Sequence, residues 1–302
     1  MTIQGCFPVL CTPFTENNEV DLCAFDSVID FAMNTGADGL VYPGTASEVA
    51  HLTALERAKL IERLGRRVNG RVPFIVGSSA DSPSVVSEYI AAGAAAGAQV
   101  AMVMAPKTIG QDISAQTQFF KNIDAKLPIM LQNAPLPFGA GLNPEQVATL
   151  ARKLESVQYI KEETLPCGAN LSTILELSGG SIKGVFGGAG GRYITDELAR
   201  GALGTVPAVE ITDLHVALVN AWRRGDYGEA HRLFAKSLPL LNMQAIFRTR
   251  LTKEVLFRRG VIGPSQSRHP DPEMDSKDLA ELEIWYNWLS SDLTWIRLEA
   301  VE

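Results

Sequence analysis

A lysine that follows an apolar segment has the clearest potential for covalent chemistry in this sequence. Residues 157–160 (VQYI) have the composition of a short buried strand, and Lys161 comes directly after them. A lysine held in a dry pocket loses affinity for its proton, and its neutral amine can then attack a carbonyl carbon. The same position also suits a strand-end lysine whose ammonium group reaches into water. The segment alone leaves both interpretations open.

Strand and helix patterns alternate along the first three quarters of the chain. Apolar segments of strand type recur at residues 5–14, 39–43, 72–77, 100–104, 128–133, 157–161, 182–186 and 204–206. Such β/α units predict an α/β fold, a (β/α)8 TIM barrel, which we assign to residues 1–225. A doubly wound open sheet is the alternative, but the GxGxxG turn typical of its first strand is not found there.

Residues 226–302 carry helical periodicity only. The pattern predicts helices over 226–240, 241–258 and 275–295, with a break in the Pro- and Ser-rich residues 263–270. We therefore expect a C-terminal three-helix appendage as a second region.

The carboxyl ends of the predicted strands hold the candidate site, because in a β/α barrel these ends meet at one catalytic face. Lys161 is the only cation among them. The other candidate positions are Thr45, Ala46, Ser47, Gln132, Asn133, Gly187 and Val206. Residues 44–47 should present hydroxyls and backbone N–H groups at a helix N-terminus, which suits a carboxylate. A lysine beside a carboxylate cradle predicts a Schiff base with a 2-oxo acid.

Composition narrows the class of protein. The chain has 302 residues, 46% of them hydrophobic, and a net charge of −7, and no basic run is longer than a pair. A nucleic-acid or membrane-surface partner is therefore not expected. The start lacks the pattern of a signal peptide, so we expect a cytoplasmic protein. The four cysteines show no CxxC pair and the four histidines no ligand spacing, so free thiols and no metal are expected.

Three ordered motifs resemble one known family. Residues 44–48 (GTASE) are similar to its GTTGE signature, residues 132–135 (QNAP) stand where it has YNxP, and residues 160–162 stand where it has IKE. The family is that of dihydrodipicolinate synthase and N-acetylneuraminate lyase, the class I Schiff-base aldolases and lyases. The resemblance covers the whole chain. It implies a β/α barrel, Lys161 as the Schiff-base lysine without any separate cofactor, and a homo-oligomer, either tetramer or dimer.

The sequence departs from the family pattern at its proton relay. The family's relay tyrosine falls on Gln132, and the second hydroxyl of the signature falls on Ala46. Glutamine has no proton to shuttle at neutral pH. The sequence looks more like the branch that contains 2-keto-3-deoxy-L-arabonate dehydratase. That likeness implies the dehydration of a 2-keto-3-deoxy sugar acid. The alternatives are a retro-aldolase that releases pyruvate, a dihydrodipicolinate-synthase-like condensation, and a non-catalytic sugar-acid binding protein.

Roles follow from the motifs and the resemblance. Lys161 is the predicted nucleophile, and Ser47, or a water held by Gln132 and Asn133, is the candidate for moving the proton. The other five candidates are predicted substrate contacts. Alternatives remain, since Ser47 also suits a helix cap and Asn133 suits a structural hydrogen bond at a strand end.

Overall fold

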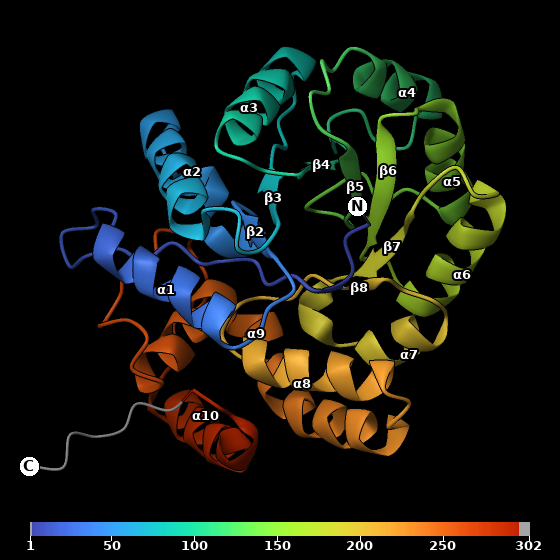
Figure 1. Cartoon of the computed structure of the whole chain (residues 1–302). Coiled ribbons are helices and arrows are strands. Elements are labelled where there is room, and N and C mark those ends of the chain that lie inside the picture. The colour runs from blue at the N-terminus through green and yellow to red at the C-terminus, as the bar shows by residue number, and fades with distance from the viewer. Residues whose placement is uncertain (1, 296–302) are drawn as a thin grey trace, which may run out of the picture. The chain divides into compact units, whose positions relative to one another are not determined.

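The computed structural model describes residues 2–295, in which strands and helices alternate along the chain (Figure 1). The strands are β1 (Gly5–Cys6), β2 (Leu40–Tyr42), β3 (Phe74–Gly77), β4 (Val100–Met104), β5 (Ile129–Asn133), β6 (Val157–Glu162), β7 (Gly184–Gly187) and β8 (Gly204–Thr205). The helices are α1 (Leu22–Asn34), α2 (Ala54–Val68), α3 (Pro83–Ala95), α4 (Ile113–Lys121), α5 (Pro144–Lys153), α6 (Cys167–Ser178), α7 (Ile194–Ala199), α8 (Thr212–Arg223), α9 (Tyr227–Arg258) and α10 (Ser276–Leu289). This alternation confirms the predicted fold class, a (β/α)8 TIM barrel.

The chain divides into two compact units. The first contains the residues up to Gly5 together with Asn69–Val206, and the second contains Cys6–Val68 together with the residues from Pro207 onward. The division into 1–225 and 226–302 stays a prediction.

The first unit is built on a parallel sheet. Its strands follow the order β1-β8-β7-β6-β5-β4-β3, and every residue of β3, β5 and β7 is buried. Helices α4, α5 and α6 run alongside these strands in Figure 1. Burial on both faces explains why the strand sequences are continuous apolar runs and do not alternate with polar residues.

Strand register decides which side chains of this sheet share a face. Gln132 of β5 pairs with Lys161 of β6, and Lys161 pairs with Phe186 of β7. In the next row Glu162 lies between Asn133 and Gly187. Because successive side chains of a strand point to opposite faces, the two rows face opposite ways.

Polar residues stand at the starts of the first three helices. Asp21 accepts a hydrogen bond from the N–H of Ala24 (2.9 Å) at the start of α1. At the start of α2, Thr53 and Glu56 exchange bonds between side chain and backbone, at 2.8 and 3.2 Å. Ser82 occupies the N-cap position of α3, but its hydroxyl bonds Ser84 and makes no cap bond.

The C-terminal part of the second unit differs from the prediction in where its helices end, and α10 ends at Leu289 and not at residue 295. Helix α9 has no break at Leu240 and Leu241, which are both buried and continue its apolar face. The helical backbone is interrupted at Arg248, where φ is +47°. Helices α8 and α9 lie side by side (Figure 1), and residues 263–270 lie outside the helices, as predicted. No helix in the described part of the chain combines the length and the hydropathy needed to span a bilayer.

The small residues at the end of α3 bring this helix very close to β3. A Cβ atom placed on Gly93 would lie 2.4 Å from a methyl carbon of Val76. That distance is far inside van der Waals contact, so the close packing of this alanine- and glycine-rich helix on β3 requires glycine here.

We predict that Gly93→Leu destabilises the fold. A side chain at this position has to displace Val76, and overpacking of this kind costs about 1–3 kcal/mol. Ala92→Leu is the matched control, because Ala92 is exposed on the same helix. Free energies of unfolding from urea titration measure both variants, and equal values would contradict the packing argument.

Candidate active site

Lys161 lies in a buried position at the carboxyl end of β6. Only 5% of the residue is exposed, and its Nζ lies 3.2 Å from Oε1 of Glu163. The strand therefore holds the amine in a dry environment and does not lead it out to solvent. This placement excludes a strand-end lysine whose ammonium group reaches into bulk water.

Glu163 is held by donors on both carboxyl oxygens. Oε2 accepts from Nε2 of Gln132 (2.7 Å), and Oε1 accepts from the N–H of Ala189 (3.0 Å). Burial alone would raise the pKa of Glu163, but the Lys161 ammonium and these two hydrogen bonds hold it below its usual value. The carboxylate beside Lys161 is therefore ionised at neutral pH.

No role for Glu163 is predicted from the sequence, although the sequence contains a signal for one. Glu163 follows Lys161 by two positions, which is the spacing that brings two side chains to one face of an extended segment. Gln132, predicted as a proton-handling residue, meets this carboxylate through its amide group. The structure thus brings Lys161, Gln132 and Glu163 together.

Asn133 and Glu162 form a separate polar group behind this cluster. Nδ2 of Asn133 donates to Oε2 of Glu162 (2.8 Å) and to the carbonyl of Leu142 (2.9 Å), and its Oδ1 accepts from the N–H of Leu142 (3.0 Å). Burial raises the pKa of Glu162 to about 7, although donors from Thr164 and Asn133 oppose the shift. These bonds favour the structural interpretation of Asn133, and its predicted contact with substrate stays a prediction.

Gly187 and Val206 lie at the ends of β7 and β8. The N–H of Val206 donates to the carbonyl of Gly187 (3.0 Å), and Val206 is buried. Gly187 has a packing reason for lacking a side chain, because a Cβ there would lie 1.8 Å from a carboxyl oxygen of Glu197. Substrate contacts at these two residues stay predictions.

The signature loop lies in the second unit and has a different local structure from the one expected. Thr45–Ser47 is a single 3-10 turn, and α2 begins only at Ala54. The loop is therefore not at the N-terminus of a long helix, because Glu48 takes a left-handed conformation (φ +57°) that ends the turn. A dipole from so short a turn contributes little to anion binding.

Ser47 is buried and fully hydrogen-bonded. Its hydroxyl donates to the carbonyl of Leu10 (2.5 Å) and accepts from the N–H of Gly44 (2.9 Å). Both hydrogen bonds stabilise the conformation of the loop. A role for Ser47 in proton transfer stays a prediction. Thr45 and Ala46 are half-buried on the same turn.

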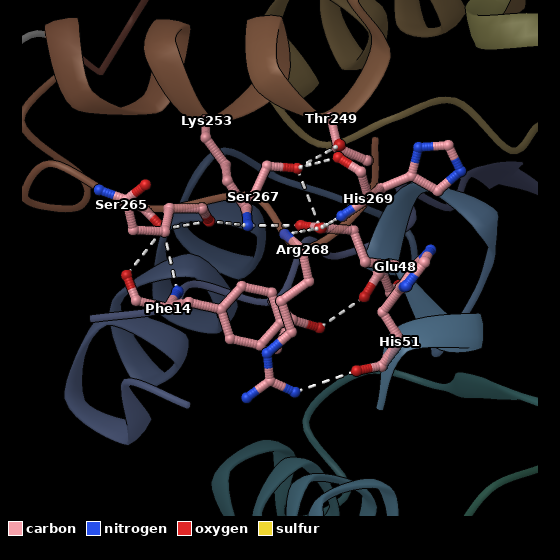
Figure 2. Close-up of polar contacts among 12 residues, drawn as sticks. Phe14, Glu48, His51, Thr249, Lys253, Ser265, Ser267, Arg268 and His269 are labelled. Atoms are coloured by element: carbon pink, nitrogen blue, oxygen red, sulfur yellow. Dashed lines mark hydrogen bonds and ion pairs between the residues drawn. The ribbon is translucent and has the colours of Figure 1, made fainter. Parts of the chain in front are cut away.

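Figure 2 shows how the C-terminal segment fixes Glu48. Its Oε2 accepts from the hydroxyl of Ser267 (3.0 Å) and from the N–H groups of Arg268 (2.6 Å) and His269 (2.7 Å). Its Oε1 pairs with Nζ of Lys253, and both side chains are almost completely buried. These donors compensate for the unusual backbone conformation of Glu48 and tie residues 265–269 to the signature loop.

Arg268 extends this attachment beyond Glu48. Its guanidinium makes two bonds to Glu56 (2.9 and 2.7 Å) and one to the carbonyl of His51 (3.0 Å). The bonds from Arg268, together with those from Thr53, lower the pKa of Glu56 to about 2. Lys253 and Arg268 both lie over the ring of Phe14, at 4.3 and 4.1 Å from its centroid. We name residues 265–269 the C-terminal strap.

Residues 2–295 contain no group of three or more His, Cys, Asp or Glu side chains arranged to hold a metal ion. All four cysteines are free thiols, as the sequence predicted, and Cys6, Cys11 and Cys167 are buried.

We predict that Lys253→Met destabilises the protein strongly. Removing the cation leaves the Glu48 carboxylate buried without its ion-pair partner, which costs about 3–5 kcal/mol. The control is Arg66→Met, whose ion pair with Glu62 is exposed (70% and 67% of the side chains) and should be worth less than about 1 kcal/mol. Urea unfolding compares the variants. Equal losses would show that the buried pair does not stabilise the fold.

Comparison with known proteins shows which family the chain resembles. It matches the dihydrodipicolinate synthetase family over residues 2–285. It is 32% identical over 285 residues to the L-2-keto-3-deoxyarabonate dehydratase of Azospirillum brasilense, with 92% of each chain covered. It is 29% identical over 245 residues to the 4-hydroxy-tetrahydrodipicolinate synthase of Maridesulfovibrio salexigens, which covers 80% of this chain and 82% of that protein.

A solved structure agrees with this assignment at the level of the fold. The crystal structure of dihydrodipicolinate synthase from Rhodopseudomonas palustris matches with a TM-score of 0.87 at 24% identity, and the match covers 95% of this chain and 97% of that one. The resemblance found in the three sequence motifs is thereby confirmed: the chain belongs to the dihydrodipicolinate synthetase family of lyases.

Proposed function

We propose that this protein is a Schiff-base lyase that dehydrates a 2-keto-3-deoxy sugar acid. The buried pair of Lys161 and Glu163 carries the proposal, because it sets a nucleophilic amine beside a carboxylate held at 3.2 Å. The relative from Azospirillum brasilense, named as a dehydratase of such an acid, supports this choice of substrate class.

The reaction starts at Lys161. Its amine, once deprotonated, adds to the C2 carbonyl of the substrate, and loss of water gives an iminium ion. The positive nitrogen withdraws electrons and acidifies the C3–H bond. Glu163 is ionised and adjacent, so it is positioned to take the C3 proton as general base. The electron pair then forms an enamine with Lys161.

Elimination follows from the same two residues. The enamine expels the hydroxyl group at C4, and Glu163, now protonated, returns the proton to that leaving group. One molecule of water is lost, the iminium is restored as a conjugated one, and hydrolysis frees Lys161. Atoms and charges balance without a separate cofactor.

Gln132 has a supporting role in this scheme. Its amide donates to Oε2 of Glu163 at 2.7 Å and fixes the orientation of the base. A dehydratase that uses Glu163 as its proton carrier does not need a relay tyrosine at position 132. Contacts of the substrate carboxylate with Thr45 and Ala46 stay a prediction from the sequence.

A condensing activity is the second candidate, since several relatives are named 4-hydroxy-tetrahydrodipicolinate synthase. The same lysine would form the enamine of pyruvate, and the two functions differ in what the enamine does next. Retro-aldol release of pyruvate is a third outcome of the same intermediate. The proposal also retains a homo-oligomer, tetramer or dimer, as its expected assembly.

We predict that borohydride reduction in the presence of pyruvate attaches a covalent adduct to Lys161. Lys161→Ala should abolish the adduct, and peptide mass spectrometry locates it. If wild-type protein forms no adduct with pyruvate or with any 2-keto-3-deoxy acid, the lyase proposal fails and a binding protein becomes the better explanation.

Glu163→Gln separates binding from proton transfer. We expect it to retain the Lys161 adduct but to lower kcat for dehydration by about 10²–10⁴-fold, which is the usual contribution of a general base. The control is Glu176→Gln, because Glu176 is an exposed carboxylate on α6. Dehydration at an unchanged rate in Glu163→Gln would remove Glu163 from the mechanism.

A further inference from the structure

A second buried carboxyl group lies close to the candidate site and takes no part in the scheme above. Glu197 is on α7 and is completely buried. In the part of the chain that the structure describes, neither of its carboxyl oxygens has a hydrogen-bond partner. Buried polar groups are almost always paired, so an unpaired carboxyl group at this position requires an explanation.

Two successive glycines accommodate Glu163 and Glu197. A Cβ on Gly187 would lie 1.8 Å from Oε2 of Glu197, and a Cβ on Gly188 would lie 2.5 Å from Oε1 of Glu163. Each carboxyl group therefore occupies the space that a side chain on one of these glycines would take. The two acids contact neighbouring residues of one backbone segment, with Lys161 bound to one of them.

The sheet register adds neighbours on the side of Glu197. Gly187 pairs with Glu162 of β6 and with Thr205 of β8, so these positions share a face. The hydroxyl of Thr205 is buried and also lacks a partner among the described residues. Glu197 thus lies beside polar side chains, Glu162 and Thr205, that carry no positive charge.

The environment keeps Glu197 protonated. An ionised carboxylate without donors is very costly to bury, so the group takes up a proton. Burial, followed by the charges of Glu163, Asp196 and Glu162, raises the pKa of Glu197 to about 8, although Lys161 opposes the shift. The thiol of Cys167 on α6 also faces this group and is neutral, because burial and Glu197 raise its pKa to about 12.

We propose that Glu197 is a positioning residue that stays a neutral carboxylic acid behind Glu163, so that Lys161 is balanced by one negative charge and not by two. Glu163 and Glu197 then have different roles because their environments differ: Glu163 is ionised and Glu197 is protonated. The inference deepens the proposed function, on which it rests for its catalytic consequence.

Loss of the Glu197 proton should impair the site. A second negative charge near Lys161 favours the ammonium form of the lysine, and an ammonium group cannot attack a carbonyl. The effect predicts an alkaline decline of Schiff-base formation that depends on Glu197. At an effective dielectric constant of about 20, a charge within about 10 Å changes such an equilibrium by about tenfold or more.

The first test does not depend on activity. An unfolded chain releases the Glu197 proton at the ordinary glutamate pKa, whereas the folded chain keeps it up to about pH 8. The stabilising contribution of this proton is therefore complete at acid pH and is lost as the pH rises toward 8. The thermal midpoint of the wild type, relative to that of Glu197→Gln, should fall by several degrees between about pH 5 and pH 8 and then level off.

A difference in midpoint that is independent of pH would overturn the inference, because a purely structural glutamate gives a constant offset. Infrared difference spectra of the wild type provide a second measurement that requires no variant. They should show a carboxylic acid band that disappears around pH 8. Its absence at neutral pH would equally contradict a protonated Glu197.

The second test measures the effect on Lys161. We compare the rate of borohydride trapping with pyruvate at pH 7 and pH 9 in the wild type and in Glu197→Gln. Between these pH values the wild-type rate should drop about tenfold or more relative to the variant. If the wild type is trapped and both proteins have the same pH profile, this inference is wrong and the proposed function is unaffected. If the wild type is not trapped at all, the proposed function is wrong.

Discussion

The buried pair of Lys161 and Glu163 is the interaction on which the rest of the site depends. A strand-end ammonium with 5% exposure needs an anion, and the anion needs donors of its own. Glu163 receives them from Gln132 and from the backbone of Ala189. Register and loop geometry explain why these groups meet, because Gln132 is the strand neighbour of Lys161 and Gly188 leaves room for the carboxylate.

Glu163 of this pair and two neighbouring glutamates, Glu162 and Glu197, have different pKa values because their surroundings differ. Glu163 has a cation and two donors, Glu162 has donors but no cation, and Glu197 has neither among the described residues. Their pKa values follow the same order, lowered for Glu163, about 7 for Glu162 and about 8 for Glu197. One residue type thus supplies a base, a structural hydrogen bond and a neutral acid.

In the second unit a different constraint fixes the signature loop. Glu48 has a left-handed backbone, which is rare for a residue with a side chain, and the C-terminal strap satisfies its carboxylate with three donors while Lys253 neutralises it. The C-terminal region therefore has a structural connection to the loop that is predicted to bind the substrate carboxylate.

The sequence predicted the fold class and the strand segments, because apolar runs are local signals. It also placed Lys161 at a strand end. It missed the donors around Glu163, which come from β5 and from the loop after β7, and it contained no signal for Glu197, whose position depends on how α7 packs on Gly187. The predicted break after Leu240 failed because helical periodicity does not show where a helix ends. Contacts between distant segments decide these features, and a single sequence does not display them.

The most direct measurement is the mass of the species trapped on Lys161 when a 2-keto-3-deoxypentonic acid is reduced with borohydride during turnover. Dehydration at C4 predicts an adduct that is lighter by one water than the simple reduced imine of the substrate, together with a dehydrated oxo acid as free product. An adduct with the mass of pyruvate alone would show carbon–carbon cleavage and would contradict the dehydratase assignment.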